Sequence, residues 1–383
     1  MTPEAADQLA DSSAAYVHIP FCAAVCPYCD FAVVAGRDSE MKRYVEALVT
    51  EIGWAEPWRH LESVYFGGGT PSHVEPGYLG RVLESLDARH GITDNAEISI
   101  EANPEDFDFE LAGELRALGF NRISFGAQSF DMAVLRQLGR RHSPDDIRRA
   151  VASARDAGFE NLSVDLIFGG EVETDTSWAS TLQQVVDLDT PHVSCYSLTV
   201  EPGTVLARQV AAGHGAPDPD IQAGRYLKAM GALPQKRYEV SNWAHEGFEC
   251  RYNMTVWAQA EYVAYGNGAH GYRNGRRFRN ARHLDTYLHR IECGQSPEVG
   301  FESVDGWAGE LDRLFVGLRR AVGVSHGPGT RALLDSEEGR RLLAAGVIET
   351  SDRLRVIEPA LTDSVCRSVL ALKPPIVSSN QNA

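Results

Sequence analysis

Three cysteines within one short stretch are the strongest chemical feature of this sequence. Cys22, Cys26 and Cys29 lie in YVHIPFCAAVCPYCDF, with the spacing C-x3-C-x2-C. Three thiolates on one loop can hold an iron–sulfur cluster, or a tetrahedral zinc ion if a histidine completes the set. His18 and His73 are the nearest candidates for that histidine, but zinc sites usually pair a C-x2-C with a second, distant pair. The spacing therefore favours a [4Fe–4S] cluster, which would leave one iron without a protein ligand.

A second unusual stretch is GGGTP at residues 67–71. Its glycines allow positive φ angles and a close approach to the backbone. We therefore expect the amides of Gly68 and Gly69 and the hydroxyl of Thr70 to meet the charged head group of a small ligand. A tight turn between a strand and a helix would explain one glycine, but hardly three in a row.

Composition and net charge limit the class of protein and the cellular compartment to which these residues can belong. The 383 residues, 43% of them hydrophobic and 23% charged, suit a globular protein. The net charge of −17 argues against a nucleic-acid partner, because phosphate binding relies on a basic surface. The acidic N-terminus has no signal-peptide pattern, and no apolar run reaches the roughly 18 residues of a transmembrane segment. The scattered positions of the other four cysteines argue against disulfides, so we predict a cytoplasmic protein.

The first two hundred residues alternate short β-branched runs with longer amphipathic runs, as in βαβ units of a parallel sheet. The expected strands are 14–19, 63–66, 97–102, 122–127, 162–168 and 192–198. The expected helices are 39–55, 76–90, 107–118, 131–138, 143–157, 174–189 and 220–232.

The positions of the unusual residues decide between two arrangements of this sheet. The cysteines, GGGTP, Glu101, Gln128 and Asp165 all fall at or near the carboxyl ends of different strands. An open doubly wound sheet gathers its ligands at one switch point, whereas a barrel mouth collects residues from every strand in turn. We therefore predict an α/β fold with a partial (β/α)6 TIM-like barrel and a smaller, mainly helical C-terminal domain.

Beyond the barrel, the pattern changes to glycine-rich and then to helical sequence. Within YRNGRRFRNARH, residues 272–283, the Asn274-Gly275 pair predicts a β-hairpin, whose arginines either face solvent or form an anion-binding arm. The expected division is a barrel over 12–205, an extension over 206–300, a helical and β-ribbon domain over 301–372 and a disordered tail over 373–383.

Taken together, these motifs resemble the radical S-adenosylmethionine (SAM) superfamily. Tyr28 before the third cysteine fits its cluster loop, and in that superfamily the amine and carboxylate of SAM bind the open iron of the cluster. Within it the chain resembles the branch of oxygen-independent coproporphyrinogen III oxidase and the HemW heme chaperones, over residues 14–360. The motifs that follow in the order of that branch are YVHIPFC, GGGTP, EANP, GAQSF, LGRRH, DLIFG, YEVSNWA and GAHG.

The resemblance implies a role for individual residues, with the three cysteines holding the cluster. Carboxylates would accept hydrogen bonds from the ribose hydroxyls and the ammonium, and Arg140 would pair with the ligand carboxylate. Without the resemblance, Asp165 could equally cap a helix and Arg140 could lie on the surface. The residues implied to bind SAM are Tyr16, Gly68, Gly69, Thr70, Glu101, Gln128, Arg140 and Asp165.

Two features separate the chaperone from the oxidase. The oxidase pattern has a further cysteine two places after the third, where this chain has Phe31, and a long extension before the cluster loop, where only 21 residues precede Cys22. Both favour the HemW family, which implies heme binding and transfer to acceptor proteins such as respiratory enzymes, without catalysis of its own; a homodimer is left open. The alternatives are a radical SAM oxidoreductase acting on a porphyrin and a zinc-stabilised binding module.

The expected heme site departs from the family pattern. HemW relatives read H-N-x-x-Y-W after EC, whereas this chain reads YNMTVW at 252–257, without the histidine and the tyrosine. Tyr252 is one candidate iron ligand, as a phenolate stabilised by Arg251, and His270 in GAHG is the other. The arginines of the 273–282 segment would suit the propionates of a porphyrin.

Overall fold

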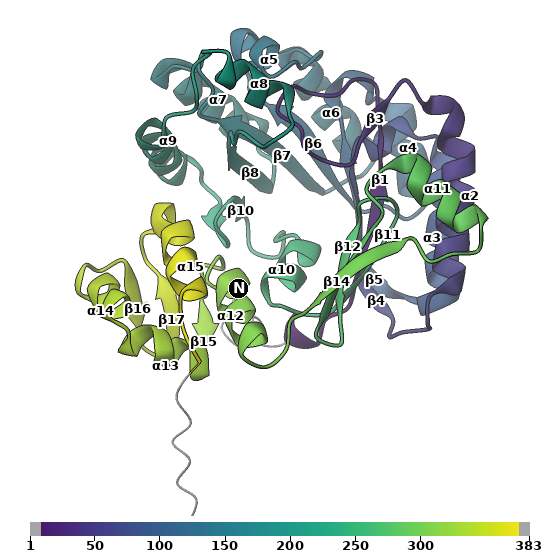
Figure 1. The fold of residues 1–383 in the computed structure, drawn as a ribbon. Coiled ribbons are helices and arrows are strands. Elements are labelled where there is room, and N and C mark those ends of the chain that lie inside the picture. The colour runs from purple at the N-terminus through teal and green to yellow at the C-terminus, as the bar shows by residue number, and fades with distance from the viewer. Residues whose placement is uncertain (1–8, 375–383) are drawn as a thin grey trace, which may run out of the picture.

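The structure is a computed structural model, and it describes residues 9–374. The tail predicted at 373–383 thus lies almost wholly outside the described residues. Within them, one twelve-stranded sheet has the order β14-β13-β12-β11-β1-β4-β5-β6-β7-β8-β10-β9 and curves into an open arc (Figure 1). The six successive parallel strands are β1 (Ala14–Ile19), β4 (Leu61–Gly68), β5 (Ile92–Ala102), β6 (Arg122–Gln128), β7 (Asn161–Phe168) and β8 (His192–Ser197).

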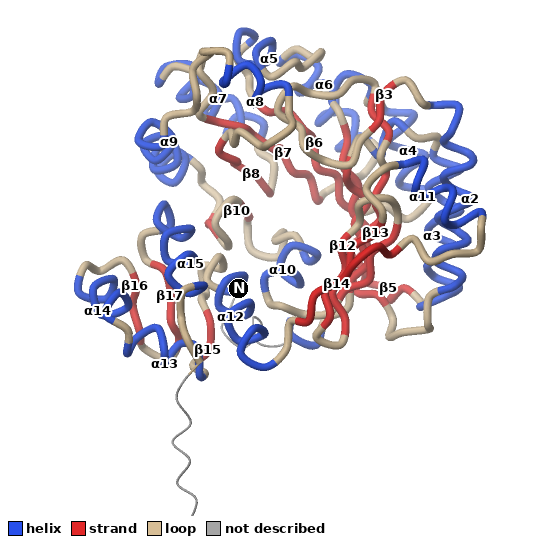
Figure 2. The backbone as a smooth tube through the Cα atoms, in the orientation of Figure 1, coloured by secondary structure: helices blue, strands red, loops and turns tan. Residues whose placement is uncertain are grey.

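Helices cover the outer face of this curved sheet (Figure 2). Ser143 and Thr174 begin two of them with capping boxes, in which each side chain accepts a hydrogen bond from the amide three residues on. The six βα units confirm the predicted partial barrel. The helices are α2 (Met41–Trp54), α3 (Pro76–His90), α4 (Phe109–Ala117), α5 (Met132–Gln137), α6 (Pro144–Asp156), α7 (Asp175–Leu188), α8 (Val205–Ala211) and α9 (Pro219–Ala232).

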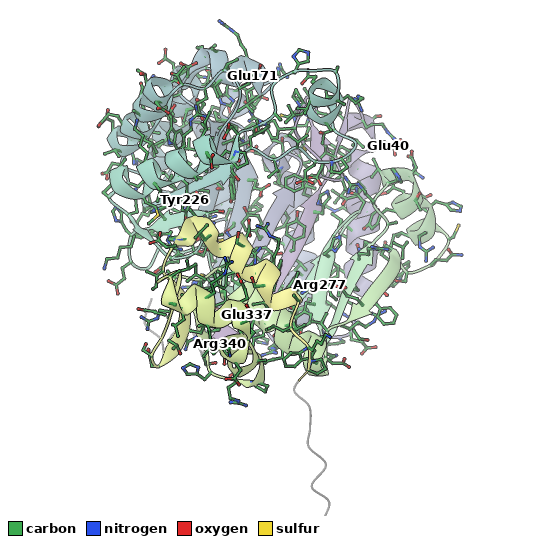
Figure 3. The ribbon with its side chains drawn as sticks, turned by 60° about the vertical axis from the view of Figure 1, so that its left-hand side comes forward. Glu40, Glu171, Tyr226, Arg277, Glu337 and Arg340 are labelled. Atoms are coloured by element: carbon green, nitrogen blue, oxygen red, sulfur yellow. The ribbon has the colours of Figure 1, made fainter. Side chains whose placement is uncertain are left out.

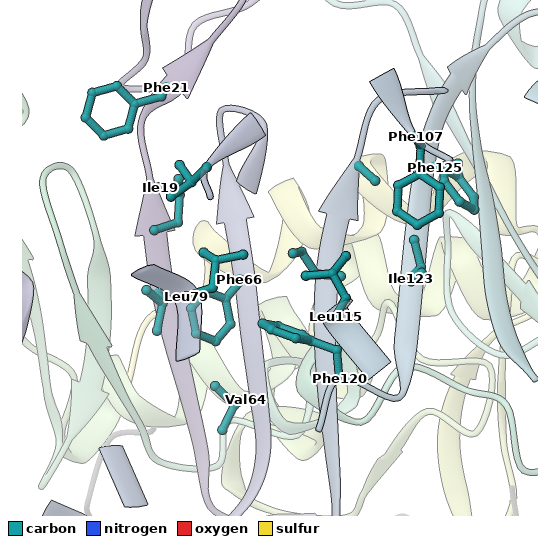
Figure 4. Close-up of a cluster of buried hydrophobic side chains, with 14 of the residues drawn as sticks. Ile19, Phe21, Val64, Phe66, Leu79, Phe107, Leu115, Phe120, Ile123 and Phe125 are labelled. Carbon is teal, nitrogen blue, oxygen red and sulfur yellow. The ribbon is translucent and has the colours of Figure 1, made fainter. Parts of the chain in front are cut away.

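The two faces of the sheet differ because successive strand side chains point to opposite sides. Toward the helices, Phe66 meets Phe120 edge to face with ring centroids 5.2 Å apart, and Phe107 meets Phe125 in the same way at 4.9 Å (Figure 4). The inner face instead carries polar residues in register, such as Glu101 opposite Ser124. The apolar outer face holds the barrel together, and the polar inner face is left for ligands.

The segment after the barrel builds both ends of the same sheet. Asn274 and Gly275 both have positive φ and join β12 to β13, which confirms the predicted hairpin. Beyond β1 the sheet continues through β11 (Tyr262–Tyr265), β12 (His270–Arg273), β13 (Arg276–Asn280) and β14 (Glu298–Ser303). Beyond β8 it continues through β10 (Asn242–Ala244) and β9 (Lys236–Arg237), and α10 (Arg251–Trp257) and α11 (Leu284–Glu292) complete the segment.

The C-terminal module has an apolar core of its own, to which Leu314, Leu333 and Leu354 contribute fully buried side chains. Figure 3 labels Glu337 in its helix α14 and Arg277 on the hairpin, which joins the module through an ion pair with Asp312 at 2.7 Å. The module consists of α12 (Gly306–Gly317), β15 (Val324–Ser325), α13 (Pro328–Asp335), α14 (Glu337–Ala344), β16 (Ile348–Thr350), β17 (Arg353–Val356) and α15 (Thr362–Leu370). Among the described residues, no helix is long and apolar enough to cross a membrane.

Candidate functional site

The loop that leaves β1 brings the three cysteines to the mouth of the barrel. Two short strands, β2 (Phe21–Cys22) and β3 (Val34–Ala35), pair in parallel and close its base. Cys22, Cys26 and Cys29 are free thiols with partly exposed side chains. Burial, helped by the neighbouring Cys29 and Cys26 thiols and opposed by the Thr70 hydroxyl and Arg140, raises the pKa of the Cys22 thiol to about 11. These three sulfurs therefore share one environment, as the spacing predicts.

A cavity of about 340 Å³ lies at the carboxyl ends of the parallel strands, above the polar inner face of the barrel. Tyr16 does not line it: its hydroxyl lies 3.2 Å from His18 Nδ1, and its ring stacks on Tyr65, which does line the cavity. The other ten predicted residues all line it, namely Cys22, Cys26, Cys29, Gly68, Gly69, Thr70, Glu101, Gln128, Arg140 and Asp165.

The backbone amides of the glycine turn are hydrogen-bonded within the protein, contrary to the prediction. The amide of Gly68 donates to Glu101 Oε2 at 3.1 Å, and the amide of Gly69 donates to the Ile19 carbonyl at 2.7 Å. The expectation that these two amides are available to a ligand is therefore wrong. The glycines are needed because the turn packs against the cluster loop, where a Cβ on Gly69 would lie 2.7 Å from the carbonyl oxygen of Phe21. Gly68 also has a φ of +115°, which L side chains rarely adopt.

Two carboxyl groups face the cavity from β5 and β7, the two strands on either side of β6. Glu101 accepts a hydrogen bond from the Tyr65 hydroxyl at 2.9 Å, and burial raises its pKa to about 7. Asp165 accepts from the Ser124 hydroxyl at 2.8 Å and from the Ser163 hydroxyl at 3.2 Å. Burial raises the pKa of Asp165, while hydrogen bonds from serine hydroxyls oppose that rise. Asp165 is thus an acceptor inside the barrel and not a helix cap.

Arg140 lies beside the cysteine loop and not on the surface. Its guanidinium donates to Asn103 Oδ1 at 2.6 Å and to Cys26 Sγ at 3.5 Å, and its Nε has no partner among the described residues. Gln128 reaches the same cavity from a β-bulge with a φ of 62°, a conformation uncommon for a residue other than glycine. Arg140 and Gln128 therefore add a cation and a polar side chain to the wall.

Sequence reasoning missed further polar residues of the same wall. Ser124 lies two residues after Arg122 on β6, and both line the cavity. The two-residue period of the strand would have found Ser124, because every second side chain points inward. Asn103 stands within the EANP motif and donates to Thr70 Oγ1 at 3.1 Å, which the sequence alone could not indicate. The remaining missed residues include Tyr65, Ser194 and Tyr196.

The first heme candidate, Tyr252, lies among other tyrosines in the barrel interior. Its ring stacks on Tyr16 and Tyr65, with centroids 5.8 and 5.1 Å away. Burial raises the pKa of Tyr252 well above its usual value, and neighbouring acidic groups raise it further. Arg251 points elsewhere, since its Nη1 donates to the Asn95 carbonyl at 2.8 Å. The predicted stabilisation of a Tyr252 phenolate by Arg251 is therefore wrong.

The second heme candidate, His270, is exposed at the start of β12, opposite Arg279 in the ladder. Desolvation lowers the pKa of His270, and the charge of Arg279 lowers it further. The hairpin arginines are mostly engaged within the chain: Arg276 pairs with Glu298, and Arg282 donates to the Asp30 carbonyl of the cluster loop. In the described part of the chain, the Arg279 side chain has no such partner. Of these three arginines, Arg279 is therefore the one whose guanidinium could still bind an anion.

A curved parallel sheet with a three-cysteine loop at its mouth defines the chain as a member of the radical SAM superfamily, whose model matches residues 16–185. In fold it is similar to the solved coproporphyrinogen III oxidase HemN of Escherichia coli, with a TM-score of 0.80 and 21% identity over 96% of this chain and 93% of that one.

Several curated relatives are more similar in sequence. The chain is 36% identical to the heme chaperone HemW of Synechocystis sp. over 82% of this chain and 79% of the relative. It is 35% identical to the HemW of Mycobacterium tuberculosis over 93% and 94%. The chain belongs to the HemW family.

Proposed function

We propose that this protein is a heme chaperone, which binds heme and passes it to acceptor proteins, and that it carries a [4Fe–4S] cluster and SAM at the barrel mouth. The observation that carries the proposal is the 35% identity to a heme chaperone over 93% of this chain. The acceptor, the homodimer, the cytoplasmic location and the absence of a nucleic-acid partner stay predictions from the sequence.

The donor chemistry of the loop fits an iron–sulfur cluster. Cys22, Cys26 and Cys29 line one cavity, but no three His, Cys, Asp or Glu side chains of the described residues converge closely enough to hold a single metal ion. This disfavours the zinc-stabilised module, because a structural zinc needs its ligands around one point, whereas the thiolates of a cluster each bind a different iron. When bound, the cluster would supply an open iron site and an electron. Arg140 would offset part of the negative charge of the thiolates from its place beside Cys26.

The cavity also suits SAM, which carries a sulfonium, an ammonium and a carboxylate. Glu101 and Asp165 offer acceptors for its hydroxyls and ammonium, and Arg140, which also lines the cavity, offers a cation for its carboxylate. The volume of about 340 Å³ lies within the roughly 300–1,000 Å³ usual for small-ligand sites.

For heme, we place the iron ligand at His270 in preference to Tyr252. Neutral imidazole is a common ligand of heme iron, and the lowered pKa of His270 keeps the ring neutral at physiological pH. The free guanidinium of Arg279 stands opposite and would suit a propionate. Tyr252 would instead have to lose a proton whose pKa is raised well above its usual value. A heme titration of His270→Ala should lose the Soret shift of the wild type, and Tyr252→Phe should keep it. Unchanged spectra in both variants would contradict both candidates.

The alternative function is a radical enzyme acting on a porphyrin. It is supported by the shared fold with an oxidase and by the polar cavity, but Phe31 stands where the oxidase pattern has a further cysteine. Phe31 is 65% exposed at the cavity rim, so it neither ligates a metal nor belongs to the core.

Anaerobic reconstitution with iron and sulfide tests the metal site. The wild type and Cys293→Ala, which changes an exposed cysteine outside the loop, should both develop cluster absorbance, and Cys22→Ala should not. Stoichiometric zinc without iron would overturn the cluster. Decarboxylation of coproporphyrinogen III at catalytic rates by the reconstituted protein would overturn the chaperone in favour of the enzyme.

A further inference from the structure

A chain of hydrogen bonds runs from Asp165 in the cavity wall to Cys250, the residue immediately before α10. The Cys250 amide lies 3.2 Å from the Tyr238 hydroxyl, which lies 2.8 Å from His192 Nε2. His192 Nδ1 lies 2.7 Å from Ser163 Oγ, which lies 3.2 Å from Asp165 Oδ1. Cys250 is the N-cap of α10, so the chain links the cofactor cavity to a helix that lies 85 residues later in the sequence.

The linking groups are shielded from solvent. Ser163, His192 and Cys250 are fully buried, and Tyr238 is 6% exposed. A buried polar group without a partner is destabilising, so each member depends on its neighbours for its hydrogen bonds. Networks of this kind hold their members in one arrangement when every group is satisfied.

One arrangement of protons satisfies every group in the chain. The Cys250 amide can only donate, so the Tyr238 oxygen accepts from it and the Tyr238 hydroxyl donates to His192 Nε2. His192 then carries its proton on Nδ1 and donates to Ser163, whose hydroxyl donates to Asp165. The reverse tautomer would leave the buried Tyr238 proton without an acceptor. Burial lowers the pKa of His192 well below its usual value, and the charge of Arg122 lowers it further, so the ring stays neutral.

We propose that His192 is a positioning residue that couples ligand binding at Asp165 to the start of α10. This rests on the proposed function, because it takes the ligand to be one whose vicinal ribose hydroxyls bind Asp165. Ligand hydroxyls that donate to Asp165 compete with Ser163 for its oxygens, and the change passes through His192 and Tyr238 to the Cys250 amide. α10 carries Asn253 into the same cavity and Tyr252 into the tyrosine stack. Occupancy of the cofactor site therefore sets the position of a second part of the barrel interior.

The first test reads the tautomer of His192 directly in the full-length protein. Two-bond ¹H–¹⁵N spectra should show a neutral ring with a protonated Nδ1 between pH 6 and pH 8, assigned by loss of the signals in His192→Gln. A ring protonated on Nε2, or a charged ring, would overturn the proposed chain.

The second test follows hydrogen exchange of the α10 amides in cluster-loaded protein with and without SAM. SAM should slow their exchange severalfold in the wild type and in the control variant Tyr226→Phe. The hydroxyl of Tyr226, which is labelled in Figure 3, is not a member of this hydrogen-bond chain and donates to the Val240 carbonyl. It should have no such effect in Tyr238→Phe or in Ser163→Ala. Slowing that persists in both variants, or that is absent from a wild type shown by calorimetry to bind SAM, would overturn the coupling. A wild type that binds no SAM would overturn the SAM part of the proposed function and the coupling with it.

Discussion

Glu51 allows a quantitative test of how the hairpin extension is attached to the barrel. This carboxyl group on α2 is buried and accepts hydrogen bonds from the Gly266 amide at 2.8 Å, Asn280 Nδ2 at 2.6 Å and the Tyr287 hydroxyl at 2.7 Å. All three donors are neutral, so burial dominates and raises its pKa from 4.5 to about 7. Ionisation of Glu51 therefore destabilises the folded state, in which this carboxyl group is buried.

The sign of the effect follows from linkage. Because the folded state binds the Glu51 proton more tightly than the unfolded state does, stability is gained as the pH falls from 7 toward 4.5 and lost as it rises. A shift of about 2.5 pH units corresponds to about 3.4 kcal/mol at 1.36 kcal/mol per unit. Between pH 5 and pH 8, the free energy of unfolding would fall by about 2.5 kcal/mol of this total.

The assay compares wild type with Glu51→Gln, which keeps the shape of the side chain without its charge. The free energy of unfolding in urea, measured at pH 5, 6, 7 and 8, should fall for the wild type relative to the variant by about 2.5 kcal/mol across this range. Taking the difference removes the contribution of other raised carboxyls such as Glu101 and Glu239. A difference that stays constant with pH would refute the reasoning.

Three further predictions concern the site and the core. Gly69→Ala would place a Cβ 2.7 Å from the Phe21 carbonyl oxygen and should lower the iron bound after reconstitution, whereas Gly77→Ala, in open space, should not; equal iron contents would contradict the packing argument. Arg140→Gln removes the cation beside Cys26 and should lower the reduction potential of the reconstituted cluster in voltammetry, with Arg141→Gln as the exposed control; an unchanged potential would place the guanidinium too far from the cluster to matter. Phe120→Ala should cost about 3–5 kcal/mol of unfolding free energy in urea, since the ring is fully buried against Phe66; a loss below about 1 kcal/mol would show that the site repacks.

The elements of the barrel were predictable because their signals are local. The strand containing Asp165 was expected at 162–168 and spans Asn161–Phe168, and the hairpin followed from Asn274 and Gly275 alone. The cavity wall was also largely predictable, because residues at the carboxyl ends of parallel strands meet at one edge.

The partners of individual atoms were not predictable, because they come from distant parts of the chain. The Gly69 amide donates to the carbonyl of Ile19, fifty residues earlier, and the Arg251 side chain on α10 donates to the carbonyl of Asn95 on β5. Nothing in GGGTP or YNMTVW records these contacts. The predictions that failed were therefore those that assigned a free hydrogen-bonding group to a residue from its type alone.

Heme transfer from this protein to an apoprotein tests the central claim most directly. The account predicts that cluster-loaded protein carrying one heme transfers it stoichiometrically to an apo-acceptor, as followed by the Soret band of the acceptor, and leaves coproporphyrinogen III unchanged under the same anaerobic conditions. Heme that never leaves the protein, or catalytic turnover of the porphyrinogen, would contradict the account.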